Sequence, residues 1–261
     1  MSAESLSSSE TNSPDRTPLY LIYHELGPGR QPYSYHCATE EFERHLQLAG
    51  ELRRAAHAGF RVPEITFDDG HQSQYSYALP LLEQYGAHAV FFVTAGWIAE
   101  RKDYMKWSDL RDLHARGHQV QSHSWSHPML THCNDAELEK ELSYSRRLIQ
   151  DSLGAPVDAI SIPNGRWDQR VVRACVAAGY RRIFTSDSWR DEEEQGGVRI
   201  FGRTNVAQSM TAPALKRLLR RGAWKMLHDA AARGKNRLRQ AVGDRAYHRI
   251  WRIVSRADAT K

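Results

Sequence analysis

The sequence predicts an α/β fold whose strands form a parallel sheet, either open or closed into a barrel. Two observations carry this prediction. Short apolar runs alternate with amphipathic stretches of helical length from Leu19 to Val206, a pattern typical of parallel strands joined by helices. Polar clusters follow several of the apolar runs, as they do at the carboxyl ends of strands in parallel α/β proteins. The composition, 41% apolar and 26% charged over 261 residues, is that of a globular protein.

Seven apolar runs are predicted strands, and five amphipathic stretches are predicted helices. The strands are residues 19–23, 63–67, 88–94, 118–121, 157–162, 182–186 and 198–201. The helices are residues 40–58, 75–86, 107–116, 135–153 and 168–179. Within the fourth helix, Leu138, Leu142 and Ile149 recur near the helical period, so that one face is apolar. We therefore expect one folded domain over residues 19–206.

The start of the chain and its cysteines predict a reduced, cytoplasmic protein. Residues 1–18 are Ser-rich and are predicted to be a disordered leader, with no apolar segment that could serve as a signal peptide. The longest mostly apolar run, 87–96, is shorter than the ~20 residues that a membrane-spanning helix needs. Cys37, Cys133 and Cys175 lie far apart, so neither a disulfide framework nor a cysteine-only zinc site is expected.

Residues 207–261 are predicted to be a basic, amphipathic helical tail. Segment 213–256 carries thirteen Lys or Arg residues against two Asp residues, whereas the whole chain has a net charge of only +5. Breaks in the helix are expected near Gly234 and Gly243. Either the apolar stripe of the tail packs on the domain, or its cationic face contacts an anionic membrane surface. No nucleic-acid-binding motif accompanies the charge, so no nucleic-acid partner is expected.

Side chains that could carry chemistry follow four of the predicted strands. Because the carboxyl ends of parallel strands meet at one edge, we expect these side chains to lie close together. In chain order the residues are His24, then Asp68 and Asp69 before Gly70, then His123 and His127 within Ser122–Pro128, and then Pro163-Asn164-Gly165.

The two aspartates and the two histidines together indicate a metal-dependent reaction. Asp68 and Asp69 cannot face the same way from an extended backbone, so one could bind a metal while the other acts as a base. His123 and His127 are four residues apart and would share one face of a helical turn. Two imidazoles and one carboxylate suit Zn²⁺ or a similar divalent ion, with a position left for water. A solvated Asp-Asp-Gly turn and surface histidines are the structural alternatives.

These residues also carry a resemblance to a known family. Thr66-Phe67-Asp68-Asp69-Gly70, followed by Ser122-His123-Ser124-Trp125-Ser126-His127-Pro128, resembles the first two motifs of the polysaccharide deacetylases. This NodB-homology family contains metal-dependent carbohydrate de-N-acetylases, and the resemblance covers about residues 19–206. It implies a distorted (β/α) barrel that hydrolyses the N-acetyl group of an amino sugar. It also implies a divalent metal, Zn²⁺ first, with Co²⁺ or Ni²⁺ as alternatives.

The resemblance assigns a role to each matching residue. It makes Asp68 the general base, and it makes Asp69, His123 and His127 the metal ligands. The backbone N–H of Asn164 becomes a donor to the oxyanion of the transition state. The implied substrate-binding residues are Trp125, Pro163 and Trp167.

The third and fourth family motifs are imperfect in this chain. The third motif usually begins with an Arg, but here it begins with Ser161, so the usual partner of the catalytic Asp is missing. Arg166 and Arg203 are the two candidates to replace it. The fourth motif is matched only loosely, by Asp187 and Trp189.

The general acid is predicted to be His24. The last family motif is a strand that ends in Leu-x-His and carries this acid. Leu227-His228-Asp229 has no predicted strand before it, whereas Leu21-Ile22-Tyr23-His24-Glu25 ends the first strand. This order resembles a circularly permuted branch of the family, which includes deacetylases of biofilm poly-N-acetylglucosamine. In that branch the acid-bearing strand opens the domain.

Two other functions are compatible with these residues. A deformylase or another amide hydrolase on the same scaffold would use metal and water in the same way. A non-catalytic, glycan-binding relative of the family would account for the presence of Ser161 where the third motif usually has an Arg. The expected partner is an N-acetylated glycan, in a polysaccharide, an oligosaccharide or a lipid-linked sugar. The basic tail could add a peripheral contact with an anionic membrane or a polysaccharide-synthesis complex.

Overall fold

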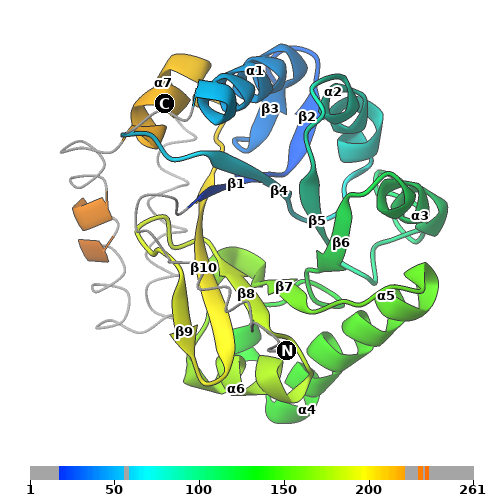
Figure 1. Cartoon of the computed structure of the whole chain (residues 1–261). Coiled ribbons are helices and arrows are strands. Elements are labelled where there is room, and N and C mark those ends of the chain that lie inside the picture. Colours follow the sequence, from blue (N-terminus) through cyan, green and yellow to red (C-terminus); the bar gives the residue numbers. More distant parts are fainter. Residues whose placement is uncertain (1–17, 56–58, 221–228, 232, 235–261) are drawn as a thin grey trace, which may run out of the picture.

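The computed structural model describes residues 18–55, 59–220, 229–231 and 233–234. Seven parallel strands form a closed barrel with helices around it (Figure 1). Around the barrel the strands are β1 (Leu19–Tyr23), β4 (Pro63–Phe67), β5 (Ala89–Val93), β6 (Gln119–Ser122), β7 (Ala159–Ser161), β8 (Arg182–Thr185) and β10 (Val198–Asn205). Pairing of β1 with β10 closes the ring. The predicted distorted (β/α) barrel is thus confirmed.

The barrel is tightly paired on one side and loosely paired on the other. β1 pairs with β4 over all five of its residues, and with β10 from Tyr20↔Arg203 onward. Between β6 and β7 only Ser122↔Ile160 is paired. There the side chain of Gln121 supplements the ladder, because its Oε1 accepts the backbone N–H groups of Asp158 and Ala159 at 3.1 and 2.9 Å. The distortion of the barrel is therefore concentrated next to the end of β6.

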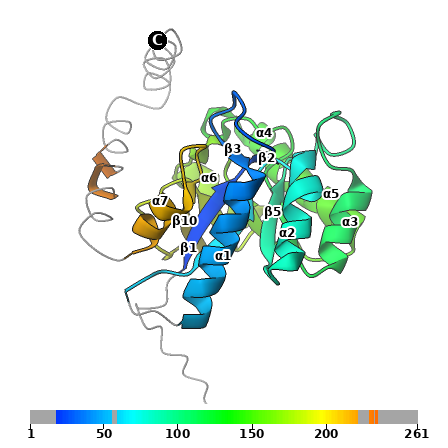
Figure 2. The ribbon, with the colours of Figure 1, turned by 90° about the horizontal axis from the view of Figure 1, so that it is seen from above.

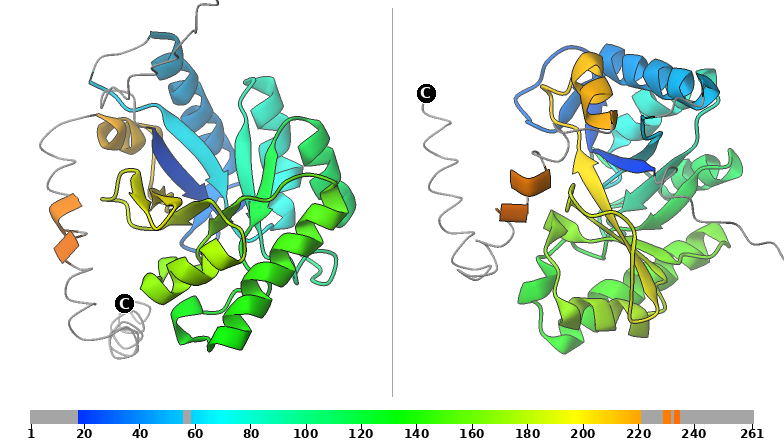
Figure 3. Two further views of the ribbon diagram at one scale, coloured as in Figure 1. Left: turned by 60° about the horizontal axis from the view of Figure 1, so that its bottom comes forward. Right: turned by 60° about the vertical axis from the view of Figure 1, so that its left-hand side comes forward.

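The helices cover the outer face of the sheet (Figures 1 and 3). They are α1 (Thr39–Ala55), α2 (Leu79–Gln84), α3 (Trp107–Ala115), α4 (Asp135–Glu139), α5 (Ser145–Leu153), α6 (Gln169–Ala177) and α7 (Ala212–Leu219). The π-helical turns η2 (Gln74–Ala78) and η4 (Lys140–Tyr144) lead into α2 and α5. Short 3-10 turns are η3 (Leu130–His132) and η5 (Pro163–Gly165). All five predicted helices are present, and residues 56–58 of the first lie outside the described residues.

Local sequence signals set several helix ends. Asn134 and Glu137 form a capping box at α4, with reciprocal hydrogen bonds of 3.0 and 2.8 Å between side chains and backbone N–H groups. Asp168 caps α6 by accepting the N–H of Val171 at 2.8 Å. Gly154 ends α5 in the left-handed conformation, with φ of 66°.

Alternate residues of each strand serve two separate cores. The outward-facing residues pack under the helices and form the large core. The inward-facing ones fill the barrel with an aromatic cluster of Phe92, Phe184 and Phe201, in which the rings of Phe184 and Phe201 stack at 4.8 Å. The polar side chains of the predicted site lie at and just after the carboxyl ends of the strands.

Three short strands were not predicted. β2 (Glu25–Gly27) pairs in parallel with β3 (His36–Ala38) at the end of the barrel where β1 finishes (Figure 2). β9 (Glu193–Gln195) pairs antiparallel with the start of β10. Each is three residues long, too short to show the alternation by which strands are recognised in a sequence.

Helix α7 packs on the barrel beside α1 (Figure 1). Its apolar stripe, Leu215, Leu218 and Leu219, is buried. The helix ends at Leu219, where the Leu219 carbonyl accepts the N–H of Arg61 at 2.9 Å and the next residue pairs with Phe60. Residues 229–231 and 233–234 are helical as well, and the predicted breaks near Gly234 and Gly243 stay a prediction. Of the two alternatives for the tail, α7 follows the first: its apolar stripe packs on the domain.

The rest of the tail (221–228, 232 and 235–261), with His228 in it, and residues 1–17 of the leader lie outside the described residues. Among the helices of the described part, none has both the length and the apolar character that crossing a bilayer requires.

Candidate metal centre and active site

The backbone is bent at the strand ends that carry the predicted site. In the described part of the chain, five residues other than glycine have positive φ. Four of them belong to the site motifs: Asp69 at 75°, Ser124 at 67°, His127 at 63° and Asn164 at 57°. This conformation costs a non-glycine residue about 1–3 kcal/mol, so it persists only where surrounding contacts hold it. The strain is therefore concentrated where side chains must be aimed at one point.

Asp69, His123 and His127 converge as the sequence predicts. One potential ligand atom from each side chain lies within 4.8 Å of the others. Asp69 Oδ1 is 3.4 Å from His123 Nε2 and 3.5 Å from His127 Nε2. Asp69 Oδ1 is also buried without a hydrogen-bond partner among the described residues, a deficit that a cation would satisfy. The donor set and this buried oxygen both fit a divalent metal ion.

The two histidines do not share a helical turn, which corrects the sequence-based expectation. Residues 123–129 form a loop, in which Ser124 and His127 are both left-handed. Ser124 Oγ accepts the N–H of His127 at 3.0 Å, and the N–H of Ser124 is donated to Ser122 Oγ at 3.2 Å. These bonds fold the loop back, so that the imidazole rings of His123 and His127 lie 4.8 Å apart.

Glu141 anchors this loop from η4. Its Oε2 accepts the backbone N–H groups of Trp125 and Ser126 at 2.9 and 2.8 Å, and its Oε1 accepts the Ser126 hydroxyl at 2.6 Å. Glu141 is buried, although it lies on a helix rich in exposed charges. Sequence reasoning missed this residue, because one more Glu on a charged helix gives no signal.

His123 presents a defined nitrogen to the metal site. Its Nδ1 lies 2.8 Å from the backbone carbonyl oxygen of Ser161, which can only accept, so Nδ1 carries the proton and Nε2 faces Asp69. Burial acts to lower the pKa of His123, but the carboxylates of Asp68 and Asp69 raise it above its usual value overall. Burial, reinforced by His123, lowers the pKa of His127 to about 4.

Asp68 points away from Asp69 and binds Arg203. The guanidinium nitrogens Nη1 and Nη2 lie 2.8 Å from Asp68 Oδ1 and Oδ2, respectively, and Ser161 Oγ donates to Oδ2 at 3.0 Å. Burial acts to raise the pKa of Asp68, but Arg203 and then His123 hold it well below its usual range. Arg203, from the last barrel strand, therefore supplies the positive charge that an Arg at position 161 would supply in the usual family motif.

Arg203 is itself held rigidly inside the barrel. Its side chain is fully buried, and its guanidinium lies 5.0 Å from the ring centroid of Phe92. Nη1 also donates to Thr66 Oγ1 at 3.0 Å. The other oxygen of the carboxylate, Asp68 Oδ2, lies 3.9 Å from His123 Nε2. Asp68 is thus fixed by Arg203 on one side and borders the metal site on the other.

His24 lies at the end of β1, next to the Asp-Asp strand. Gln74 Nε2 donates to the backbone carbonyls of both His24 and Asp68, which ties the two strand ends together. Burial lowers the pKa of His24, and the carboxylates of Asp69 and Asp68 act in the opposite direction. The imidazole ring lies 5.2 Å from the ring of Tyr35. The structure thus brings His24 into the same electrostatic site as the two aspartates.

The third motif forms the turn η5 after β7. Asn164 is exposed there and has a left-handed φ of 57°. Gly165 has φ of +60°, and a Cβ at this position would lie 2.5 Å from Ser186 Oγ, so only glycine fits. Pro163 is buried.

The residues of the third and fourth motifs contact each other. Trp167 Nε1 donates to Asp187 Oδ2 at 3.0 Å, and the guanidinium of Arg190 lies 4.9 and 4.8 Å from the rings of Trp167 and Trp189. The loosely matched fourth motif therefore supports the predicted substrate-binding residue Trp167.

Aromatic side chains surround the candidate metal site. Trp125, predicted to bind substrate, packs against Tyr144 with ring centroids 4.7 Å apart. Trp97, which sequence reasoning missed, lies 5.3 Å from the ring of His127 and 5.0 Å from that of Tyr104. Arg101 covers Trp97 at 3.9 Å. Because Trp97 follows the end of β5, its position after a predicted strand is the signal that could have found it.

Comparison with known proteins gives a consistent result. The sequence profile of the family named polysaccharide deacetylase matches residues 56–183, a range that contains the metal-site residues but neither His24 nor Arg203. The Bacillus subtilis protein YxkH is 24% identical over 219 residues, covering 78% of this chain and 76% of YxkH. A chitooligosaccharide deacetylase of a Bradyrhizobium strain is 29% identical over 182 residues, covering 69% of this chain and 76% of that protein.

The fold also matches a solved structure. The Streptococcus pyogenes deacetylase PplD superposes with a TM-score of 0.69 at 19% sequence identity, over 78% of this chain and 99% of PplD. At this identity the likeness concerns the fold. The sequence profile, the curated relatives and the barrel with its Asp-Asp and His-x-x-x-His strand ends together show that the chain belongs to the polysaccharide deacetylase family.

Proposed function

We propose that this protein is a metal-dependent hydrolase that removes the N-acetyl group from an amino sugar of a glycan, releasing acetate and leaving a free amine. One observation carries the proposal. The two adjacent aspartates have different surroundings: Asp69 faces the two histidines, whereas Asp68 binds Arg203 and lies 3.9 Å from His123 Nε2. Relatives named as polysaccharide and chitooligosaccharide deacetylases support the substrate class.

The ion that we propose for the site is Zn²⁺, with Co²⁺ and Ni²⁺ as alternatives. Asp69, His123 and His127 would hold it, because two imidazole nitrogens and one carboxylate oxygen are a donor set that Zn²⁺ accepts with a position left open. When bound, such an ion polarises a carbonyl and lowers the pKa of water toward ~7.

Asp68 is the proposed general base. Arg203 and Ser161 fix its carboxylate at the border of the metal site, 3.9 Å from His123 Nε2, where it can accept the proton of the attacking water. Such proton transfer contributes ~10²–10⁴-fold to the rate. The backbone N–H of Asn164 is the proposed donor to the oxyanion, an interaction that in other hydrolases contributes ~2.7–4 kcal/mol.

His24 is the proposed general acid, which protonates the leaving nitrogen. The place of its strand supports this role: β1 precedes β4 in the chain and pairs with it over all five residues, so His24 and Asp68 follow neighbouring strand ends. We therefore assign the protein to the circularly permuted branch of the family. Trp125, Pro163 and Trp167 are the proposed walls of the sugar site.

The experiment is acetate release from N-acetylglucosamine oligomers by the metal-loaded enzyme, beside Asp68→Asn and His24→Ala. We expect release that requires metal and falls about 10²-fold or more in each variant. Circular dichroism and metal content check that the variants are folded and loaded. If the loaded wild type released no acetate from any amino sugar, the proposed function would be wrong.

We also propose a peripheral location for the protein at an anionic surface. The excess of basic residues in segment 213–256 supports it, because each Lys or Arg near an anionic membrane contributes ~1 kcal/mol. Co-sedimentation with phosphatidylglycerol vesicles, but not with phosphatidylcholine vesicles, is the expected result. Equal sedimentation with both would contradict it.

A further inference from the structure

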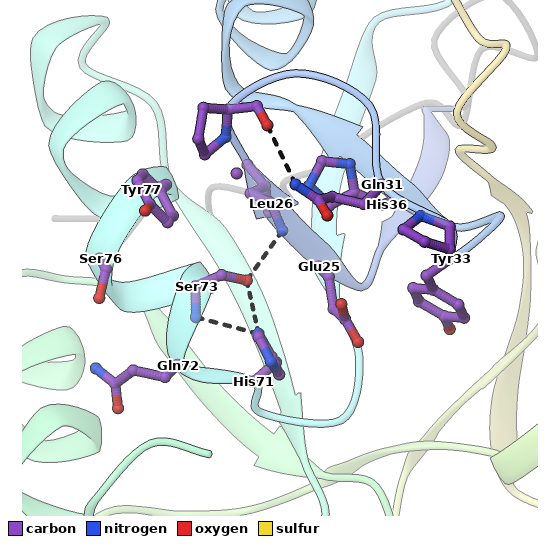
Figure 4. Close-up of a pocket in the computed structure, with 13 residues that line it drawn as sticks. Glu25, Leu26, Gln31, Tyr33, His36, His71, Gln72, Ser73, Ser76 and Tyr77 are labelled. Carbon is purple, nitrogen blue, oxygen red and sulfur yellow. Dashed lines mark hydrogen bonds between the residues drawn. The ribbon is translucent and has the colours of Figure 1, made fainter. Parts of the chain in front are cut away.

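A cleft of about 560 Å³ lies between β2 and the segment 71–77 (Figure 4). One wall comes from β2, β3 and the loop between them, and the other from the segment that follows Asp68-Asp69-Gly70. The cleft lies close to His24, because Glu25 follows His24 in the chain and the ring of Tyr33, in the lining, lies 6.3 Å from that of His24. Its volume lies within the ~300–1,000 Å³ of ordinary ligand pockets.

Exposed tyrosines gather around this cleft. Five large hydrophobic side chains of the described residues are exposed, and three of them are here: Tyr33 at 39%, Tyr35 at 37% and Tyr77 at 42%. Tyr33 and Tyr77 line the cleft, and Tyr35 packs between Tyr33 and His24, with ring distances of 5.8 and 5.2 Å. Exposed aromatic groups that cluster at one place mark a binding surface, and an aromatic ring with a polar tip suits the mixed faces of a sugar.

The rest of the lining mixes apolar residues, such as Leu26, Pro28 and Pro32, with polar ones, and it contains a single acidic residue, Glu25. Gln31, Gln72 and Ser76 offer amide and hydroxyl groups, and the lining contains no Lys or Arg. Burial lowers the pKa of His36, which favours its neutral form. Glu25 lies between Tyr33 and His71 in Figure 4. A carboxylate in a cleft without a basic side chain attracts a cation and repels an anion.

The two walls are fixed to each other by hydrogen bonds. Ser73 Oγ accepts the backbone N–H of Leu26 in β2 at 2.9 Å and lies 2.8 Å from His71 Nδ1. Gln74 bonds the carbonyls of His24 and Asp68, so the same segment is anchored to the site. The cleft is therefore preformed and holds a constant position relative to His24 and the metal ligands.

From this arrangement we infer that the cleft binds the sugar residue next to the one being deacetylated, and that this neighbour is a hexosamine, preferably with a free amine facing Glu25. The inference rests on the proposed function, because it extends the substrate from one sugar to its neighbour. It follows that the enzyme acts on oligomers better than on a monosaccharide. It also follows that a neighbouring sugar with a carboxylate is disfavoured.

The first test compares kcat/KM for the tetramer and the monomer of N-acetylglucosamine. Tyr77→Ala is expected to lower the tetramer-to-monomer ratio by about three- to tenfold, because it removes one aromatic face. Val176→Ala, an equally exposed apolar residue on α6, is the matched control and is expected to keep the wild-type ratio. An unchanged ratio in Tyr77→Ala would overturn the inference.

The second test addresses the amine. The wild type should prefer a tetramer with one glucosamine unit to the fully acetylated tetramer. Glu25→Gln is expected to reduce this preference by about two- to fivefold, as for a partly exposed ion pair. Glu139→Gln, an exposed carboxylate at the end of α4, is the matched control. A preference of the wild type for oligomers with a neighbouring N-acetylmuramic acid would overturn the assignment of Glu25.

A binding measurement separates the two proposals. Tetraglucosamine, which has no acetyl group to lose, is titrated into the metal-loaded enzyme by calorimetry. Weaker binding to Tyr77→Ala and to Glu25→Gln than to the wild type would support the cleft even if no acetate were ever released. Acetate release together with equal binding to all three proteins would leave the proposed function intact and refute the cleft.

Discussion

Arg203 on β10 and Asp68 at the end of β4 form a paired ion contact across 135 residues of chain, with both nitrogen–oxygen distances at 2.8 Å. The sequence lacks the Arg that usually begins the third family motif, and Ser161 stands in that place. Ser161 still binds the same carboxylate, through its hydroxyl at 3.0 Å. Asp68 thus has a cationic partner, but this partner enters from the strand on the other side of β1.

Substitution of Arg203 should lower the free energy of unfolding as well as the rate of acetate release. Arg203→Met leaves Asp68 buried without its cation, which costs about 3–5 kcal/mol in the free energy of unfolding. Arg203→Lys should lose less, because it keeps a positive charge beside Asp68, although one ammonium cannot bond both carboxylate oxygens as the guanidinium does. Urea denaturation measures both. Ser161→Ala is the control, with an expected loss of about 1 kcal/mol. Equal losses in Arg203→Met and Ser161→Ala would refute the role of the ion pair.

Substitution of the two aspartates should have different effects on metal content. Asp69→Ala removes a ligand and is expected to abolish stoichiometric metal binding. Asp68→Asn should keep the metal, because its carboxylate faces Arg203, but should lose turnover. Metal analysis after gel filtration, together with acetate release, checks the pair. Near-wild-type turnover in Asp68→Asn would show that the role assignment is wrong.

Glu141 is expected to act on metal affinity through the loop that it holds. Glu141→Gln replaces one acceptor oxygen with an amide donor, so at least one of the three hydrogen bonds to residues 125–126 is lost. Because groups that orient metal ligands typically contribute 10–100-fold to affinity, we expect the metal Kd to rise by about tenfold or more. Competition with a chelator measures it. Glu139→Gln should leave the Kd unchanged, and a similar rise in both variants would refute the role of Glu141.

Asn164 offers a test of whether its backbone or its side chain is used. Asn164→Gly keeps the N–H and relieves the left-handed strain, so acetate release should persist and stability should not fall. Asn164→Ala should cost about 1 kcal/mol, because alanine tolerates φ of 57° less well than asparagine or glycine. Loss of activity in Asn164→Gly, in a protein that is still folded, would show that the side chain is needed.

His45 should make the protein less stable in mild acid. It is fully buried, its Nδ1 lies 3.0 Å from the hydroxyl of Tyr23, and burial lowers its pKa to about 4. Between pH 6.5 and 4 the unfolded chain therefore binds a proton that the folded protein does not. The stability contributed by His45 is complete above pH 6.5 and declines as the pH falls toward 4.

At pH 5 the expected loss from His45 is about 2 kcal/mol. His45→Gln keeps a neutral acceptor for Tyr23 but does not titrate, so its stability should change less between pH 7.5 and pH 5. Urea denaturation at the two pH values compares the variant with the wild type. An equal loss in both proteins would show that His45 does not contribute to the acid sensitivity.

The sequence alone determined the barrel strands and the residues of the metal centre. β1 and β4 begin and end at the predicted residues, because a buried strand of a parallel sheet is a short apolar run between polar residues. The separation of Asp68 from Asp69 is equally local. The two carboxylates part at the turn that follows β4: Asp69, with φ of 75°, reaches the histidines, and Asp68 reaches Arg203.

Only the tertiary structure decided which distant residues complete the site. Arg203 and Arg166 are equivalent as sequence candidates, and it is the closure of β10 on β1 that brings Arg203 to Asp68. In the sequence, Glu141 is one of many charged residues on its helix. Only the packing of this helix against the loop of His123 and His127 distinguishes it from the others. The short strands β2 and β3 form a cleft wall only when paired. The positions of Arg203, Glu141 and the β2–β3 pair all depend on contacts between segments far apart in the chain. Such contacts cannot be predicted from the local pattern of neighbouring residues.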